Sequence, residues 1–93
     1  MPQVKYSPVY DELEITFKES SVTSVHESLN GIFLEFDGDE LAYIIAPHFS
    51  RSIPVKITDN TNFVYEGLNF SDLTATLIIK MDHQKLNIKI DLS

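Results

Sequence analysis

Hydrophobic and polar residues alternate along several short stretches of the chain. Every second residue is apolar from Glu12 to Lys18 and again from Ile32 to Phe36. A period of two places the apolar side chains on one face of a strand and the polar ones on the other. The segment from Leu41 to Ala46 is apolar throughout, which predicts a strand that is central in its sheet or covered on both faces. In the first stretch the expected inward-facing residues are Leu13, Ile15 and Phe17.

Turn signals separate these stretches. Asp37-Gly38-Asp39-Glu40 lies between two apolar runs, and glycine adopts a positive φ at little cost, so we expect a hairpin there. Near the C-terminus, Thr74–Met81 and Leu86–Leu92 alternate in the same way, which predicts a second hairpin. The residues between them, 82–85, contain no glycine, so we expect a longer loop built on a type I turn.

The signals are weaker between the two hairpins. Pro47 and Pro54 interrupt any continuous hydrogen-bonded ladder. We expect short strands at Ile53–Ile57 and Phe63–Tyr65, the first at a sheet edge, and another edge-like strand at Val22–Val25. No apolar stripe of helical period runs longer than about two turns, which predicts at most one short helix or 3₁₀ turn.

These elements predict a mainly β fold, or an α+β fold with at most one short helix. The expected architecture is an antiparallel β-meander sheet that curls into a half-barrel or a small sandwich. At 93 residues the chain has the size of a single domain, residues 1–93. It contains no cysteine, so the fold has no disulfide, and we expect it in the reducing cytoplasm. We expect neither a signal peptide nor a membrane span, because the longest apolar run is only Leu41–Ala46.

The formal net charge is −7, and it is unevenly placed. Residues 1–46 hold nine acidic residues against two lysines, whereas residues 47–93 hold five acidic and five basic residues. Direct nucleic-acid binding is not expected, since it needs Lys and Arg to neutralise phosphates. An acidic surface favours a protein partner with a basic surface, and a merely solvated face is the alternative.

No pattern of catalytic or metal-binding residues is present. The three histidines have no short ligand spacing, and Asp37 and Asp39 resemble only the first half of a calcium loop, whose closing glutamate is absent. Glu12 and Glu14 share a strand face, and Glu35 is a candidate to join them, but exposed acidic pairs usually stay solvated. No nucleophile motif or glycine-rich phosphate loop occurs. We therefore expect a non-enzymatic protein with no catalytic residue, cofactor or metal.

Phe33 raises a separate question, because its alternation puts it beside Glu35 on the acidic side of its strand. Two outcomes are open. The C-terminal half of the chain covers Phe33, which we favour because a small domain has few large side chains to spare, or Phe33 anchors a partner.

Residues 6–50 resemble the YuzE-like bacterial family, a domain of unknown function. Members open with a Y-D-P-x-x-D-x-L-x-I-x-F strand, then show a polar stretch with glutamate, a G-x-x-x-D-Y-D strand and turn, an I-x-I-x-x-A strand and a serine. The chain departs from this pattern at Ser7, in a shortened turn and in the insertion Pro47-His48-Phe49, and residues 51–93 form an extension outside it. The matching residues are Tyr6, Pro8, Asp11, Leu13, Ile15, Phe17, Glu27, Gly31, Leu34, Phe36, Asp37, Gly38, Leu41, Ile44, Ala46 and Ser50.

This resemblance implies a β-meander but no activity, since the family has none that is established. Genes of the family often lie near those of putative toxins, which implies an antitoxin or accessory role. Together with the charge, this predicts an acidic protein-binding module that acts as an inhibitor by masking a basic, nucleic-acid-handling partner. The alternative is a self-associating structural or accessory protein, a homodimer paired through Val22–Val25 or the final hairpin. The expected partner-binding residues are Glu12, Glu14, Phe33, Glu35, Asp37, Asp39 and Glu40.

Overall fold

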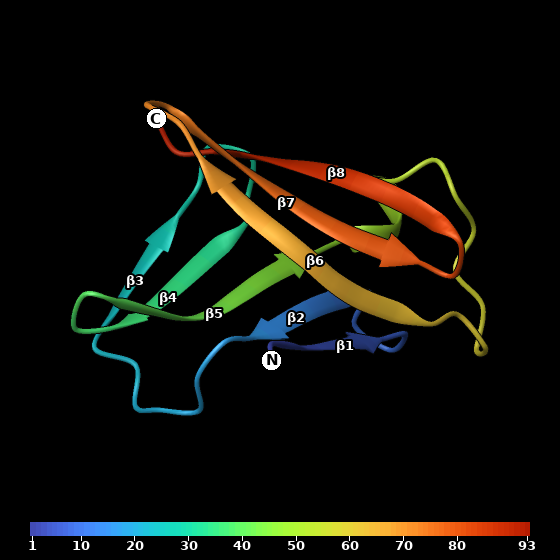
Figure 1. Cartoon of the computed structure of the whole chain (residues 1–93), viewed down its shortest axis with the longest axis horizontal. Coiled ribbons are helices and arrows are strands. Elements are labelled where there is room, and N and C mark those ends of the chain that lie inside the picture. The colour runs from blue at the N-terminus through green and yellow to red at the C-terminus, as the bar shows by residue number, and fades with distance from the viewer.

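The computed structural model describes all residues, 1–93, as two antiparallel sheets that pack face to face (Figure 1). The mainly β class and the sandwich are therefore confirmed, and the two sheets stay separate rather than closing into one barrel. The single helical element is the 3₁₀ turn η1 (Phe49–Arg51), within the predicted limit of one. The five-stranded sheet has the order β1-β2-β5-β4-β3, and the three-stranded sheet has the order β6-β7-β8. The strands are β1 (Gln3–Ser7), β2 (Glu12–Thr16), β3 (Ser24–Glu27), β4 (Phe33–Asp37), β5 (Glu40–Pro47), β6 (Phe63–Phe70), β7 (Thr74–Met81) and β8 (Gln84–Asp91).

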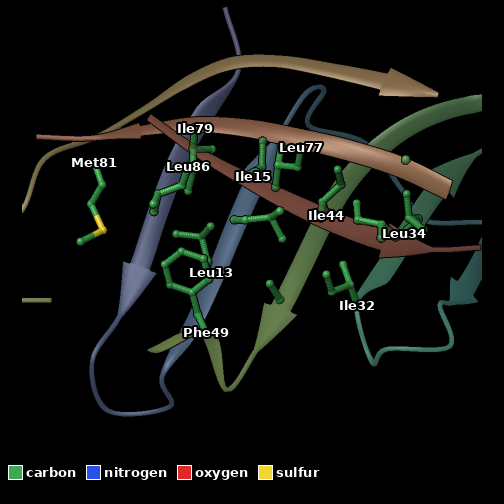
Figure 2. Packing of buried hydrophobic residues seen from close by; sticks show 14 residues of the cluster. Leu13, Ile15, Ile32, Leu34, Ile44, Phe49, Leu77, Ile79, Met81 and Leu86 are labelled. Carbon is green, nitrogen blue, oxygen red and sulfur yellow. The ribbon is translucent and has the colours of Figure 1, made fainter. Parts of the chain in front are cut away.

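The core lies between the inner faces of the two sheets (Figure 2). Leu13 and Ile15 of β2 are fully buried, as their alternation predicts, and Ile44 of β5 lies beside Ile15 in register. The three-stranded sheet contributes the opposite wall, mainly through β7 and β8. Burial of apolar surface is the main term that holds such a sandwich together. The remaining core residues are Ile32, Leu34, Ala46, Phe49, Ala75, Leu77, Ile79, Met81, Leu86, Ile88 and Ile90.

The first predicted hairpin is confirmed, and β5 is the central strand of its sheet. Asp37 pairs with Glu40, so the connection is the two-residue turn Gly38-Asp39. Gly38 has a φ of 63°, and a positive φ at the first turn position is the conformation that favours glycine in tight hairpins.

The second hairpin is also confirmed, but its turn is shorter than expected. Met81 pairs with Gln84, which leaves only Asp82 and His83 in the turn. Asp82 takes the positive φ (56°) that a glycine would otherwise supply, as aspartate does more readily than most residues. The Asn62 backbone N–H donates to Asp82 Oδ1 at 2.9 Å, so a contact from outside the hairpin supports the tight turn.

The segment between the hairpins differs most from the sequence expectation. Residues 53–57 form no strand: Ile53, Val55 and Ile57 pack against the core in alternation, but Pro54 lacks an N–H and no neighbouring strand pairs with them. The predicted strand at Phe63–Tyr65 is the start of the eight-residue β6, which continues past a bulge at the register shift between Tyr65 and Gly67. At the N-terminus, β1 is a strand that the sequence analysis did not anticipate.

On one side of the sandwich, the loop after the edge strand β3 is tied to the edge strand β8. The predicted edge strand at Val22–Val25 lies two residues further along, at β3, and is an edge as expected. Beyond it, Leu29 N–H donates to the Asp91 carbonyl at 2.7 Å. The Asn30 side chain donates to the Lys89 carbonyl at 2.7 Å and accepts from Asp91 N–H at 3.0 Å. Asn30 thus takes the place of a neighbouring strand over the last residues of β8.

Candidate protein-binding face

The outer face of the five-stranded sheet is the surface that carries most of the predicted binding residues. Residues directly paired across antiparallel strands share a face, so the register defines it. One row across the sheet reads Lys5, Glu14, Ile45, Phe33 and Glu27. The next row reads Gln3, Thr16, Tyr43, Glu35 and Val25.

The centre of this outer face is apolar and its surroundings are acidic. Phe33, Tyr43 and Ile45 are half-buried and adjacent across β4 and β5. Glu14 on β2 and Glu35 on β4 lie on opposite sides of the β5 residues Ile45 and Tyr43. Phe33 has Glu27 of β3 directly opposite it. A few large side chains inside a charged rim is the arrangement typical of protein-binding surfaces.

The position of Phe33 differs from our expectation that the C-terminal half of the chain covers it. The C-terminal half covers the face that Leu34 points into, which is the core side of β4, and Phe33 points the opposite way. Phe33 is therefore outside the hydrophobic core and is not covered by the three-stranded sheet. The argument that a small domain cannot leave a phenylalanine uncovered fails here because its own neighbours on β4 and β5 half-bury the ring.

The other predicted acidic residues do not form one cluster with Glu14 and Glu35. Glu12 lies at the far end of β2, between Ser7 and Pro47 in register. Asp37 and Glu40 flank the first hairpin turn and share Lys18, whose Nζ lies 3.7 Å from Asp37 Oδ2 and 3.2 Å from Glu40 Oε1. The hydrogen bond and charge of Glu40, with a smaller contribution from Asp37, raise the pKa of Lys18. Asp39 is exposed at the turn itself.

The connection from β2 to β3 borders the face near this turn. Ser20 N–H donates to Tyr43 Oη at 3.3 Å, which holds the connection against an outward-facing side chain. Thr23 fixes its other end, since Thr23 N–H donates to the Phe36 carbonyl at 2.8 Å and Gly38 N–H donates to Thr23 Oγ1 at 2.8 Å. These contacts order the border of the face without covering Phe33 or Ile45.

A polar cluster joins Tyr6, Asp11 and Ser50. Asp11 accepts hydrogen bonds from Tyr6 Oη (2.6 Å, to Oδ1), Ser50 N–H (2.9 Å, to Oδ1) and Ser50 Oγ (2.6 Å, to Oδ2). Its own carbonyl accepts from Phe49 N–H at 2.9 Å. Asp11 thereby fastens the turn between β1 and β2 to η1, and both carboxylate oxygens are occupied. These hydrogen bonds make Asp11 a structural lock between the β1–β2 turn and η1.

The same hydrogen bonds set two pKa values. Desolvation alone raises the pKa of Asp11, but the hydrogen bonds from Ser50 and Tyr6 and the charge of His48 outweigh it and bring the pKa below its ordinary value. The hydrogen bond to Asp11, helped by burial and by the charge of Asp11, raises the pKa of Tyr6 to about 12.

We expect the Tyr6 hydroxyl to make the protein sensitive to strong alkali. A pKa raised on folding means that the stabilising contribution is complete below the ordinary tyrosine value of about 10 and is lost as the pH rises through about 12. Urea unfolding should therefore show wild type more stable than Tyr6→Phe by a constant margin at neutral pH, and that margin should vanish between these two values. A margin that stays constant in alkali would show that the hydroxyl does not donate to Asp11.

Comparison with protein-family models, with curated proteins and with solved structures finds no match. No three His, Asp or Glu side chains are grouped so that they could hold a metal ion. No helix is long and apolar enough to cross a membrane.

Proposed function

We propose that the protein is a non-enzymatic binding module whose acidic outer face docks on a basic surface of a protein partner. The observation that supports this most directly is the outer face itself, where the half-buried side chains of Phe33, Tyr43 and Ile45 have acidic neighbours, Glu14, Glu27 and Glu35, on the adjoining strand positions. Charge complementarity speeds such an association, and the central side chains supply affinity as they lose their remaining contact with water.

The partner that fits this surface best is a nucleic-acid-handling protein, because its own substrate requires a basic face. By covering that face, the module would act as an inhibitor or as an antitoxin-like protein. This role agrees with the resemblance to the YuzE-like family, which we likewise propose rather than establish. A cytoplasmic location is part of the same proposal.

We expect a charge reversal on the outer face to abolish partner capture. Wild type immobilised in a lysate of the source cell should retain proteins at low salt and release them as ionic strength rises, since exposed charges are screened. Glu14→Lys with Glu35→Lys should lose the same proteins, with affinity reduced about tenfold or more.

The matched control is Glu66→Lys with Asp72→Lys, which changes the net charge equally at exposed positions of β6 and the β6–β7 turn. This control should keep the captured proteins, and mass spectrometry should identify them as basic. If both double variants lost the captured proteins equally, the effect would come from net charge and not from the outer face. If wild type retained no protein at low salt, the proposal would be contradicted.

A second candidate function is self-association, favoured by the edge strand β3. It is four residues long and exposed throughout, and Val25 is 55% exposed on the same outer face. Pairing of β3 between two copies would extend the five-stranded sheet and cover Val25. Light scattering separates the two functions, because a strict monomer at high protein concentration excludes the second and leaves the first intact.

A further inference from the structure

The outermost strand of the smaller sheet, β8, has a free edge along most of its length. It pairs with β7 only, and in an antiparallel pair alternate residues direct both backbone groups away from the partner. Asp91 N–H, Asp91 C=O and the Lys89 carbonyl point to the outer side, where Leu29 and Asn30 bind them. The same alternation places the backbone groups of Asn87 and Lys85 and the N–H of Lys89 on this side.

No hydrogen bond within the fold reaches these earlier groups. The backbone bonds outside the regular ladders and the side-chain bonds include none to Lys89 N–H or to either backbone group of Asn87 and Lys85. Asn30 therefore satisfies the last part of the β8 edge, including the Lys89 carbonyl, and leaves open both backbone groups of Lys85 and Asn87 and the N–H of Lys89. An open edge of this length is a template for one more strand.

A cleft of about 370 Å³ lies beside the open part of the edge. Its apolar walls come from both sheets and include the buried side chains of Phe49 and Ile88. Clefts of this size accommodate side chains or small ligands, and the apolar part of this lining, which is Ile32, Ala46, Phe49 and Ile88, favours an apolar group. The lining residues are Asn30, Ile32, Ala46, Pro47, Phe49, Ser52, Asn87, Ile88 and Lys89.

The solvent-exposed face of the smaller sheet is basic at β8, in contrast to the acidic outer face of the larger sheet. Lys85 and Lys89 alternate with buried residues and therefore point outward, and Lys80 of β7 lies directly opposite Lys85. Like charges at directly opposed positions destabilise a sheet. Only Lys89 has a carboxylate in contact, that of Asp91 at 3.3 Å. A negative charge placed next to Lys85 would relieve its repulsion with Lys80.

We propose that the β8 edge binds an extended acidic segment of a partner protein by strand addition. Its backbone pairs with both backbone groups of Lys85 and Asn87 and with the N–H of Lys89. Its apolar side chains enter the cleft beside Ile88, and its alternate carboxylates lie beside the outward lysines. Hydrogen bonds along the edge align the bound segment with β8. The lysines and the cleft select a sequence that alternates acidic and apolar residues. The site is separate from the acidic outer face and does not depend on the function proposed for that face.

A second copy of this chain does not fit the edge equally well. The strand of this protein that alternates acidic and apolar residues is β2, with the sequence Glu12-Leu13-Glu14-Ile15-Thr16. It is paired with β1 on one side and β5 on the other, so it cannot be offered to another copy without unfolding the larger sheet. The other edge strands, β1, β3 and β6, lack this alternation.

The direct test is titration of ¹⁵N-labelled protein with the blocked peptide Glu-Val-Glu-Val-Glu. We expect chemical-shift changes at the cleft and slowed hydrogen exchange at the amides of Asn87 and Lys89. Two control peptides should bind about tenfold or more weakly: Lys-Val-Lys-Val-Lys, and the Glu-Val peptide with alternate amides N-methylated, which prevents ladder pairing. Absence of these changes at millimolar peptide would overturn the proposal, as would equal binding of the N-methylated form.

Two variants at one position sharpen the test. Asn87→Pro removes the outward N–H, a change that an edge strand tolerates, whereas Asn87→Thr keeps it. The proline variant should lose most of its affinity for the peptide, whereas the threonine variant should retain it. Urea unfolding midpoints, measured for both variants, check that each is folded. Equal binding by both variants would overturn the proposal. Shift changes at β8 that arise on concentrating the protein alone would do the same, since they would assign the edge to a second copy.

Discussion

Replacement of Ile44 by alanine should lower the free energy of unfolding by about 2–5 kcal/mol, a large share of the roughly 5–15 kcal/mol typical of a small domain. Ile44 is 1% exposed and lies in the central strand β5, in register with Ile15 on one side and Leu34 on the other. The shortened side chain leaves a cavity bordered by two neighbouring strands and the facing sheet, and such a position has little freedom to collapse.

The next residue supplies the matched control. Ile45 has the same side chain in the same strand, but it points to the outer face and is only half-buried. Ile45→Ala should cost about 1 kcal/mol. Urea unfolding followed by circular dichroism measures both variants. Equal losses, or a larger loss for Ile45→Ala, would contradict the assignment of the two faces of β5.

Alternation along the chain was enough to predict the inner faces of β2, β4, β7 and β8, because each has one face in the core and one in water. Leu13 and Ile15 illustrate this, since both are buried and the polar residues of β2 lie on the opposite face of the strand. The prediction for β6 stopped too early for a physical reason. The bulge near Glu66 inserts one residue, so Tyr65 and Leu68 both pack against the core although they are three positions apart.

Strand order and long-range contacts could not be predicted from the sequence. Glu14 and Glu35 were expected on one face and lie on it, but nothing local indicates that β5 separates them and places Ile45 and Tyr43 between them. The strand β1 contributes only Val4 and Tyr6 to the core, too few for a pattern. The lock at Asp11 joins residues 39 positions apart and could not be recognised from either segment alone.

After Ile44→Ala, removal of the Asp11 side chain should cause the second largest loss of stability among the substitutions proposed for this protein. Asp11→Ala deletes the acceptor of three hydrogen bonds and leaves the hydroxyl groups of Tyr6 and Ser50 without this partner. It also puts alanine at a φ of 51°, a conformation that aspartate and asparagine tolerate better. We expect a loss of about 2–4 kcal/mol in the free energy of unfolding.

Two further substitutions separate the causes of this loss. Asp11→Asn keeps the backbone conformation and one acceptor oxygen, so its loss should be about half that of alanine. Asp59→Ala removes an exposed carboxylate that makes no hydrogen bond and should change stability by less than about 0.5 kcal/mol. The Asp11 lock also anchors Phe49, which is 1% exposed and contacts Tyr6 and Phe63 with ring centroids 6.1 Å away from each. Fluorescence of the tyrosines should therefore change in the alanine variant.

The pH dependence identifies the carboxylate as the stabilising group. The pKa of Asp11 is lowered on folding, so its contribution is complete above the ordinary aspartate value of 3.8 and is lost as the pH falls through the lower value of the folded protein. The margin between wild type and Asp11→Ala should thus be constant near neutral pH and shrink in acid below 3.8. A margin that does not change with pH would assign the loss to backbone strain at residue 11, because strain does not titrate. In that case the hydrogen bonds from Tyr6 and Ser50 would contribute little, and the turn conformation together with the backbone bond from Phe49 N–H to the Asp11 carbonyl would hold η1 in place.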